Sequence, residues 1–439
     1  MNDTATRPAR TGPAPRTARG PSPLAVLATA QFLVVLSASI VNVALPQIRT
    51  GLALSDAGQA WTVNAYVLAF GALLPVGGRA GDVYGLRRTF LTGTGLFAAA
   101  SLGAALAPSA TVMIVCRAAQ GTGAALLAPA ALALVLTLHP TGRARGTALG
   151  VWGAVSGAGG AAGVLLGGVL TGLYGWRAVF VPMVPLALAV LAAGRLLPAA
   201  DRPRGGSLDL PGALTLTAGL TALTYGLTGP WAIALAGPPL LAAFLVLQRR
   251  AAAPLVPARM RAVARPGLLM ALLGAVWLGL FYFLPLYQQR VLGYSPLEAG
   301  LTQLPLALMI ALSSWATGRR AGPRVLPAGL LLLAAGLAWL ARTPADGSFV
   351  PDLLGPTLLI GAGLGAAFVR LTALSSAGVA PADSGLAGGL TNATRQIGGA
   401  LGLSALTLLP TFGTAFLACA ALTLLIAFLA ALPASTRKV

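Results

Sequence analysis

One stretch of the sequence decides the fold: Gly78-Arg79-Ala80-Gly81-Asp82-Val83-Tyr84-Gly85-Leu86-Arg87-Arg88. It lies between two hydrophobic segments and combines tight-turn glycines, one acid and paired arginines. Glycines and charges together mark a turn, and long apolar runs on both sides are typical of membrane-spanning helices. The stretch therefore indicates a charged loop between two spans.

The composition of the chain also indicates a membrane protein. Of its 439 residues 57% are hydrophobic and only 9% are charged, and the mean hydropathy is +0.84. A soluble domain of this length does not have such a composition. The net charge of +20 does not indicate nucleic-acid binding, because the basic residues are dispersed over separate loops without interleaved aromatic residues.

Apolar stretches of about 20 residues, each long enough to cross a bilayer, recur along the chain. Every backbone amide in lipid needs a partner within its own segment or a closed barrel, so these runs are expected to be helices. The sequence predicts an all-α integral membrane protein with about 14 transmembrane helices, at 24–45, 59–77, 89–107, 110–136, 147–171, 176–197, 210–228, 231–248, 267–288, 297–316, 325–341, 352–371, 392–409 and 412–432.

The arginines predict the orientation, because short loops rich in Lys and Arg stay on the cytoplasmic side. With the amino terminus inside, 22 of the 29 basic residues fall in the cytoplasm. Both termini are then cytoplasmic, as a disordered tail over 1–23 and a short tail over 433–439. Only Arg49, Arg177, Arg290 and Arg342 fall on the outer side of the membrane.

Four motifs resemble one known family. The stretch from Gly78 to Arg88 resembles the signature loop of the major facilitator superfamily, which joins the second and third helices. Val34–Pro46 is similar to a first-helix motif, and Arg117–Ala125 to a second signature of that superfamily. Gly385–Gly402 is similar to the penultimate helix of its fourteen-helix drug:proton antiporter (multidrug efflux) family.

The resemblance implies the major facilitator fold, with two six-helix halves and two inserted helices. The first half is expected over 24–197, the inserted linker helices over 210–248 and the second half over 267–432. A degenerate copy of the signature loop, without the acid, stands at Gly318–Arg324.

The resemblance also implies a function. It predicts a monomeric efflux transporter in the bacterial inner or plasma membrane, which exports small amphipathic compounds (drug, antibiotic or secondary metabolite) by alternating access coupled to proton influx. An uncoupled facilitator, an importer and a non-transporting sensor or scaffold with a carrier fold remain alternatives. No enzyme, cofactor or metal site is expected, since the spans hold no catalytic or metal-ligand set and Cys116 and Cys419 lie far apart in sequence.

The signature loop is expected to gate transport. Asp82 would accept hydrogen bonds from the facing half, while Arg87 and Arg88 pair with cytoplasmic acids, and Gly78 and Gly85 form the turns. The alternative is that the arginines only anchor the topology.

Proton coupling raises a separate question, because the family usually has an aspartate in the first helix where this chain has Ser37. All nine acids map to tails, loops or helix ends. Asp56 and Glu298, near the outer ends of their helices, are the candidate proton sites. The alternative is that both cap helix amino termini, following Ser55 and Ser295.

The embedded charges are positive instead. Arg117 and Arg395 fall within spans, where a charge costs at least about 2.5 kcal/mol, so each should face a water-filled cavity or a partner. A cavity rich in positive charge and poor in carboxylates favours anionic or neutral amphipathic substrates. Further cavity candidates, each also able to act as helix-to-helix glue, are Gln120, Ser37, Asn42, Asn64, Tyr66, Tyr282, Gln303 and Asn392.

A glycine ladder marks the fifth span. Gly159, Gly163 and Gly167 recur at four-residue spacing, which lets two helix backbones approach closely. The functional interpretation is a sliding contact between the two halves, and the alternative is ordinary tight packing.

Overall fold

The computed structural model describes residues 22–139, 142–198, 208–251, 254–319, 322–377, 379 and 383–432. Of the predicted tails, over 1–23 and 433–439, only residues 22 and 23 are among the described residues. Its helices are α1 (Pro23–Gly51), α2 (Asp56–Tyr84), α3 (Leu86–Ala105), α4 (Ala110–Leu138), α5 (Gly142–Tyr174), η1 (Trp176–Val179), α6 (Met183–Gly194), α7 (Leu210–Thr228), α8 (Trp231–Ala234), α9 (Gly237–Arg250), η2 (Ala258–Val263), α10 (Ala264–Arg290), α11 (Pro296–Thr302), α12 (Leu304–Arg319), α13 (Val325–Leu340), η3 (Phe349–Leu354), α14 (Gly355–Ser376), α15 (Ser384–Leu406) and α16 (Phe412–Ala431).

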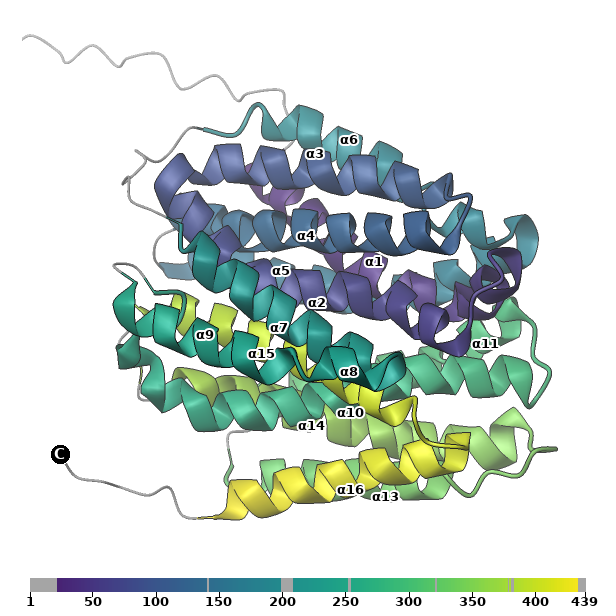
Figure 1. Ribbon diagram of the computed structural model, residues 1–439. Coiled ribbons are helices and arrows are strands. Elements are labelled where there is room, and N and C mark those ends of the chain that lie inside the picture. The colour runs from purple at the N-terminus through teal and green to yellow at the C-terminus, as the bar shows by residue number, and fades with distance from the viewer. Residues whose placement is uncertain are drawn as a thin grey trace, which may run out of the picture.

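The prediction of an all-α membrane protein is confirmed. When each short helix or turn is joined to the helix it leads into, the described residues hold fourteen helical segments, one for each predicted span. Ten of these segments are long and apolar enough to cross a membrane, and α13 is a shorter apolar helix. The helices run side by side along one common direction (Figure 1).

The helices pack in two groups. In the first group α2 and α3 both pack on α4, and α1 packs on α5. In the second, α10 packs on α15 and α13 packs on both α14 and α16. Figure 1 shows the first group, in purple and blue, beside the second, in green and yellow, with α7, α8 and α9 crossing in front of their boundary.

Local sequence explains where the decisive helices begin and end. Ser55 caps α2 by accepting a hydrogen bond from the Gly58 amide at 3.1 Å. Gly85 ends α2 and begins α3 with φ of 93° and ψ of 140°, a conformation that is essentially restricted to glycine.

The signature stretch is therefore not a loop throughout. The apolar run ends near Gly77, and the sequence predicted that the helix would end there too. Instead α2 continues to Tyr84, so Gly78 and Asp82 lie on its last turns and only Gly85 makes the turn. Helix hydrogen bonding does not depend on hydrophobicity, so α2 extends beyond its apolar part until Gly85 breaks it.

Candidate transport site

The helix bundle has two distinct ends. The α1–α2 end holds the turn at residues 52–55, which the charge distribution predicts to be extracellular. The α2–α3 end holds Gly85 and is predicted to be cytoplasmic.

Arg117 is enclosed within the first group of helices. Only 1% of its surface is exposed. Its Nε donates to the Thr62 carbonyl at 3.0 Å, and its Nη1 donates to the Ser37 carbonyl at 3.5 Å and to Gln120 Oε1 at 2.5 Å. The guanidinium carbon lies 4.4 Å from the centre of the Tyr66 ring. Arg117 thus ties α4 to α1 and α2 through neutral acceptors.

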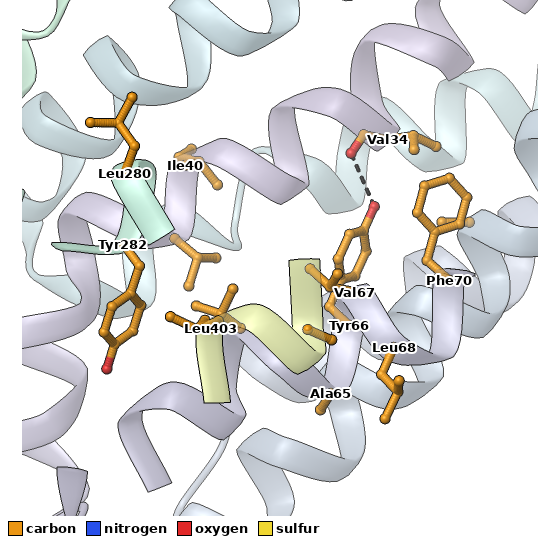
Figure 2. Packing of buried hydrophobic residues seen from close by; sticks show 14 of the residues in the cluster. Val34, Ile40, Ala65, Tyr66, Val67, Leu68, Phe70, Leu280, Tyr282 and Leu403 are labelled. Atoms are coloured by element: carbon orange, nitrogen blue, oxygen red, sulfur yellow. Dashed lines mark hydrogen bonds between the residues drawn. The ribbon is translucent and has the colours of Figure 1, made fainter. Parts of the chain in front are cut away.

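The partners of Arg117 extend this network. Gln120 Nε2 donates to Ser101 Oγ on α3 at 2.8 Å, so the network reaches a fourth helix. The Tyr66 hydroxyl donates to the Val34 carbonyl at 3.0 Å, as Figure 2 shows. All of these side chains are buried, so the contacts are those expected of hydrogen bonds between helices, which was the alternative to a cavity role.

Asn64 links the two groups of helices. Its Nδ2 donates to Ser404 Oγ on α15 at 2.9 Å, and both side chains are fully buried. Further along the same pair of helices, a Cβ at Gly71 would lie 2.7 Å from that of Gln396. The α2 and α15 helices therefore touch near the middle of the bundle.

Of the four other predicted cavity residues, all buried, Ser37 lies beside Arg117, whereas Asn42, Tyr282 and Gln303 lie elsewhere. Ser37 Oγ and Asn42 Oδ1 have no hydrogen-bond partner among the described residues. The Tyr282 ring lies edge-on to Phe283 at 5.1 Å, and Figure 2 shows Tyr282 well apart from Tyr66. Gln303 Nε2 donates to the Ala299 carbonyl at 3.1 Å, at the junction of α11 and α12.

Arg395 differs from Arg117, because it is half-buried and lies midway along α15. Its Nη2 donates to Asn392 Oδ1 at 2.9 Å. The guanidinium carbon lies 6.0 Å from the centre of the Trp277 ring. Trp277 in turn stacks on Phe281 at 5.7 Å and meets Phe368 at 5.6 Å, so an aromatic cluster adjoins the charge.

At the α1–α2 end an ion cluster joins the two groups of helices. Asp56 Oδ1 lies 2.8 Å from Arg49 Nη1 and 3.6 Å from Arg290 Nη1, which comes from α10. Arg290 also donates to Gln59 Oε1, and Gln289 Nε2 donates to the Val43 carbonyl at 2.9 Å. The sequence placed Arg49 and Arg290 at this end only from the predicted topology. In the structure both also form ion pairs with Asp56.

Glu298 has the geometry of a helix cap. Its carboxylate accepts from the Ser295 amide and hydroxyl, both at 2.8 Å, while Ser295 Oγ accepts from the Glu298 amide at 3.2 Å. This reciprocal pair is a capping box at the start of α11.

The glycine ladder packs within one group of helices. A Cβ at Gly159 would meet Phe32 and Val35, one at Gly163 would meet Ser39, and one at Gly167 would meet Ile40, all on α1. The expected contact between halves does not involve these three glycines. Their four-residue spacing places all three glycines on the side of α5 that packs against α1.

A neighbouring face of α5 makes the contact between the two groups. A Cβ at Gly168 would lie 2.6 Å from the Pro296 carbonyl and 3.2 Å from Gly300 Cα, both on α11. Val164 on the same face packs with Val43 and Ala299.

Toward the α2–α3 end that same face is open. Gly153 and Gly157 precede Val164 and Gly168 at helical spacing, so all four lie on one face. A Cβ at Gly153 or Gly157 would meet no described atom within 4 Å. The two groups therefore touch along α5 at the α1–α2 end and separate toward the α2–α3 end.

The signature residues make local contacts. Arg87 Nη2 donates to the Arg195 carbonyl just after α6, not to an acid as expected, because the end of α6 presents an unpaired carbonyl next to it. Arg88 is exposed and Asp82 is half-buried.

Sequence reasoning missed several residues of these clusters. Ser404, Gln59, Trp277 and Phe368 were not singled out. A weak signal existed for the aromatic cluster, since Trp277 and Phe281 stand four residues apart and four-residue neighbours meet on a helix.

Comparison with known proteins identifies the family. The profile described as "Major Facilitator Superfamily" matches residues 27–403. The chain belongs to the Major Facilitator Superfamily. Members of this superfamily are transporters and not enzymes, so the protein is a multi-pass membrane transporter of small molecules.

Its similarity to other superfamily proteins extends over most of the chain. The cephamycin export protein of Amycolatopsis lactamdurans is 40% identical over 92% of this chain and 88% of its own length. A puromycin resistance protein of Streptomyces alboniger is 41% identical over 92% and 84%. A tetracenomycin C resistance and export protein of Streptomyces glaucescens is 34% identical over 88% and 75%.

Solved structures show the same fold at lower identity. A peptide transporter in complex with sulfate superposes with a TM-score of 0.69 over 93% of this chain and 94% of its own, at 17% identity. The inward open xylose transporter of E. coli superposes with a TM-score of 0.69 over 94% and 97%, at 15% identity. At these identities the likeness shows the fold alone.

Proposed function

We propose that this protein exports small amphipathic compounds, such as an antibiotic or another secondary metabolite, from the bacterial cytoplasm by alternating access. Three relatives at 34–41% identity are named for export of, or resistance to, cephamycin, puromycin and tetracenomycin C. The proposed setting is the plasma membrane with both termini in the cytoplasm, and the proposed unit is one chain.

One observation supports this mechanism most directly: α5 is packed at one end and open at the other along a single face. Val164 and Gly168 contact the second group of helices, whereas Gly153 and Gly157 meet open space. In alternating access the two halves rock about a site near the middle of the membrane, so one end opens as the other closes. The proposed moving units are 24–197 and 267–432, with 210–248 as the linker.

The ion cluster at the α1–α2 end supports a state in which this end is closed. Asp56 contacts Arg49 in its own group and Arg290 in the other. These contacts, and the bond from Gln289 to the Val43 carbonyl, must break before the α1–α2 end can open. In the proposed cycle the substrate enters from the α2–α3 end and leaves at the α1–α2 end.

Proton coupling is a finer part of the proposal. Every acid in the described residues lies in a loop, in a short connecting turn, or within a turn of a helix end. Of the two candidate proton sites, Asp56 is favoured because protonation would weaken its contacts to two arginines. Glu298 is already used by its own helix cap.

Transport into inside-out vesicles tests the proposal. Vesicles that contain the protein should accumulate cephamycin, puromycin or tetracenomycin C when the interior is acidified, and substrate should collapse the imposed pH gradient. Asp56→Asn should lose the proton movement, and the matched Glu298→Gln variant should keep it.

The alternatives give different results in the same vesicles. Substrate flux without proton movement would identify an uncoupled facilitator. Flux only in right-side-out vesicles would identify an importer. Binding without flux in either orientation would identify a sensor with a carrier fold.

A further inference from the structure

Arg395 and its neighbours form a built group that the proposed transport cycle does not yet use. The charge lies midway along α15, is half-buried, and has Asn392 as its only hydrogen-bond partner among the described residues. Arginine has five N–H donors, so the one hydrogen bond that Arg395 donates leaves most of them available. A charge held at this depth normally has a counter-charge or a water-filled cavity.

The face of α15 that carries Arg395 leads to open space. Gly385, Gly388, Asn392 and Arg395 follow one another at spacings of three, four and three, so they share one face of the helix. A Cβ at Gly385 or Gly388 would meet no described atom within 4 Å. The path along this face therefore runs from the open α2–α3 end to the guanidinium.

An aromatic surface lies beside the charge. Trp277 on α10 is 6.0 Å from the guanidinium carbon, and Phe281 and Phe368 pack against its ring. All three rings are half-buried, like Arg395. A planar apolar group can stack on such rings, while a guanidinium binds a carboxylate through two parallel hydrogen bonds.

We propose that Arg395, oriented by Asn392 and flanked by Trp277, binds the carboxylate of an amphipathic aromatic anion in this transporter. This rests on the proposed function for its place in a transport cycle, but the binding itself requires no transport. Arg117 does not compete for the anion, because only 1% of its surface is exposed and three of its five N–H donors already bind the carbonyls of Ser37 and Thr62 and the side chain of Gln120.

Equilibrium binding to the protein in lipid nanodiscs tests the proposal. The probes are three pairs of nearly equal shape, each an anionic acid and its neutral primary amide: phenylacetate, 2-naphthylacetate and 1-pyrenylacetate, each with its amide. Calorimetric titration, with empty nanodiscs as the blank, should show that the wild type binds at least one acid about tenfold more tightly than its amide.

Variants then locate the preference. Arg395→Gln should bring acid and amide within about twofold of each other. Asn392→Asp should also bring acid and amide within about twofold. Its carboxylate would pair with the Arg395 guanidinium, and the side chain would keep nearly the same shape. Arg370→Gln, which removes another embedded arginine on α14, should keep the preference. Trp277→Leu should weaken acid and amide alike, on the order of fivefold.

The outcomes separate this proposal from the proposed function. Equal binding of acid and amide by the wild type in all three pairs, which includes no binding of either, would overturn the anion site whether or not the variants fold. An unchanged preference in Arg395→Gln would also overturn it. Anion binding without export in vesicles would instead leave the site in place and refute the transport proposal.

Discussion

Arg117 has the largest fully buried side chain among the described residues, and its contacts predict a structural part. Arg117→Met would remove donors to the carbonyls of Thr62 and Ser37 and leave Gln120 Oε1 without its partner. We expect a loss of about 1–3 kcal/mol in stability, seen as a lower midpoint of thermal unfolding in detergent. Arg370→Met is the control, because the Arg370 Nε has no hydrogen-bond partner among the described residues.

A different result for Arg117→Met would contradict the structural role. An unchanged unfolding midpoint together with lost transport would mean that Arg117 contacts substrate in another state of the cycle. Arg117 and Arg395 look alike in the sequence, since both lie next to small residues in apolar helices. Their burial distinguishes them, and burial depends on which face of each helix the neighbouring helices cover.

At the scale of elements, α5 offers two matched glycines on one face. Gly157→Leu places a side chain in open space, so it should fold normally but obstruct closure of the α2–α3 end. Gly168→Leu should instead force α5 and α11 apart, because its Cβ would lie 2.6 Å from the Pro296 carbonyl. Labelling of a single Gly153→Cys residue by an impermeant thiol reagent should be faster in Gly157→Leu and slower in Gly168→Leu than in the parent.

This pair is a sharper test than a glycine of the ladder that the sequence analysis interpreted as a sliding contact. Gly163 lies on the α1 side of the helix, where a larger side chain would clash with Ser39 and disturb the first group of helices itself. Equal labelling rates in Gly157→Leu and Gly168→Leu would contradict the view that this face closes and opens.

The sequence predicted the position of every helical segment, because a bilayer demands long apolar runs and short polar connections. It was less successful with the site. The chain could show that Asp56, Arg49 and Arg290 lie at one end, but not that they touch, since Arg290 is more than 200 residues away in sequence. It also placed a loop at Gly78 and Asp82, where α2 in fact continues to Tyr84.

At the scale of the whole molecule, the Asp56 cluster should bias the balance between the two open states. Asp56→Asn removes the charge that faces Arg49 and Arg290, and with 75% of the Asp56 side chain exposed each contact is worth about 0.2–1 kcal/mol. Only the contact with Arg290 crosses between the two groups, so the population open at the α1–α2 end should rise by about 1.4-fold to fivefold. Spin labels at Gly146→Cys and Gly318→Cys, where a Cβ would meet no described atom within 4 Å, should report a larger fraction of short distances at the α2–α3 end.

Salt provides the independent check on that prediction. Exposed ion pairs weaken as the screening length falls from about 10 Å at 0.1 M to about 3 Å at 1 M, so the parent protein in 1 M salt should approach the distance distribution of Asp56→Asn. The variant itself should respond little to salt, because its main charge contact at this end is already gone. If high salt shifted both proteins equally, the bias would lie in charges other than Asp56.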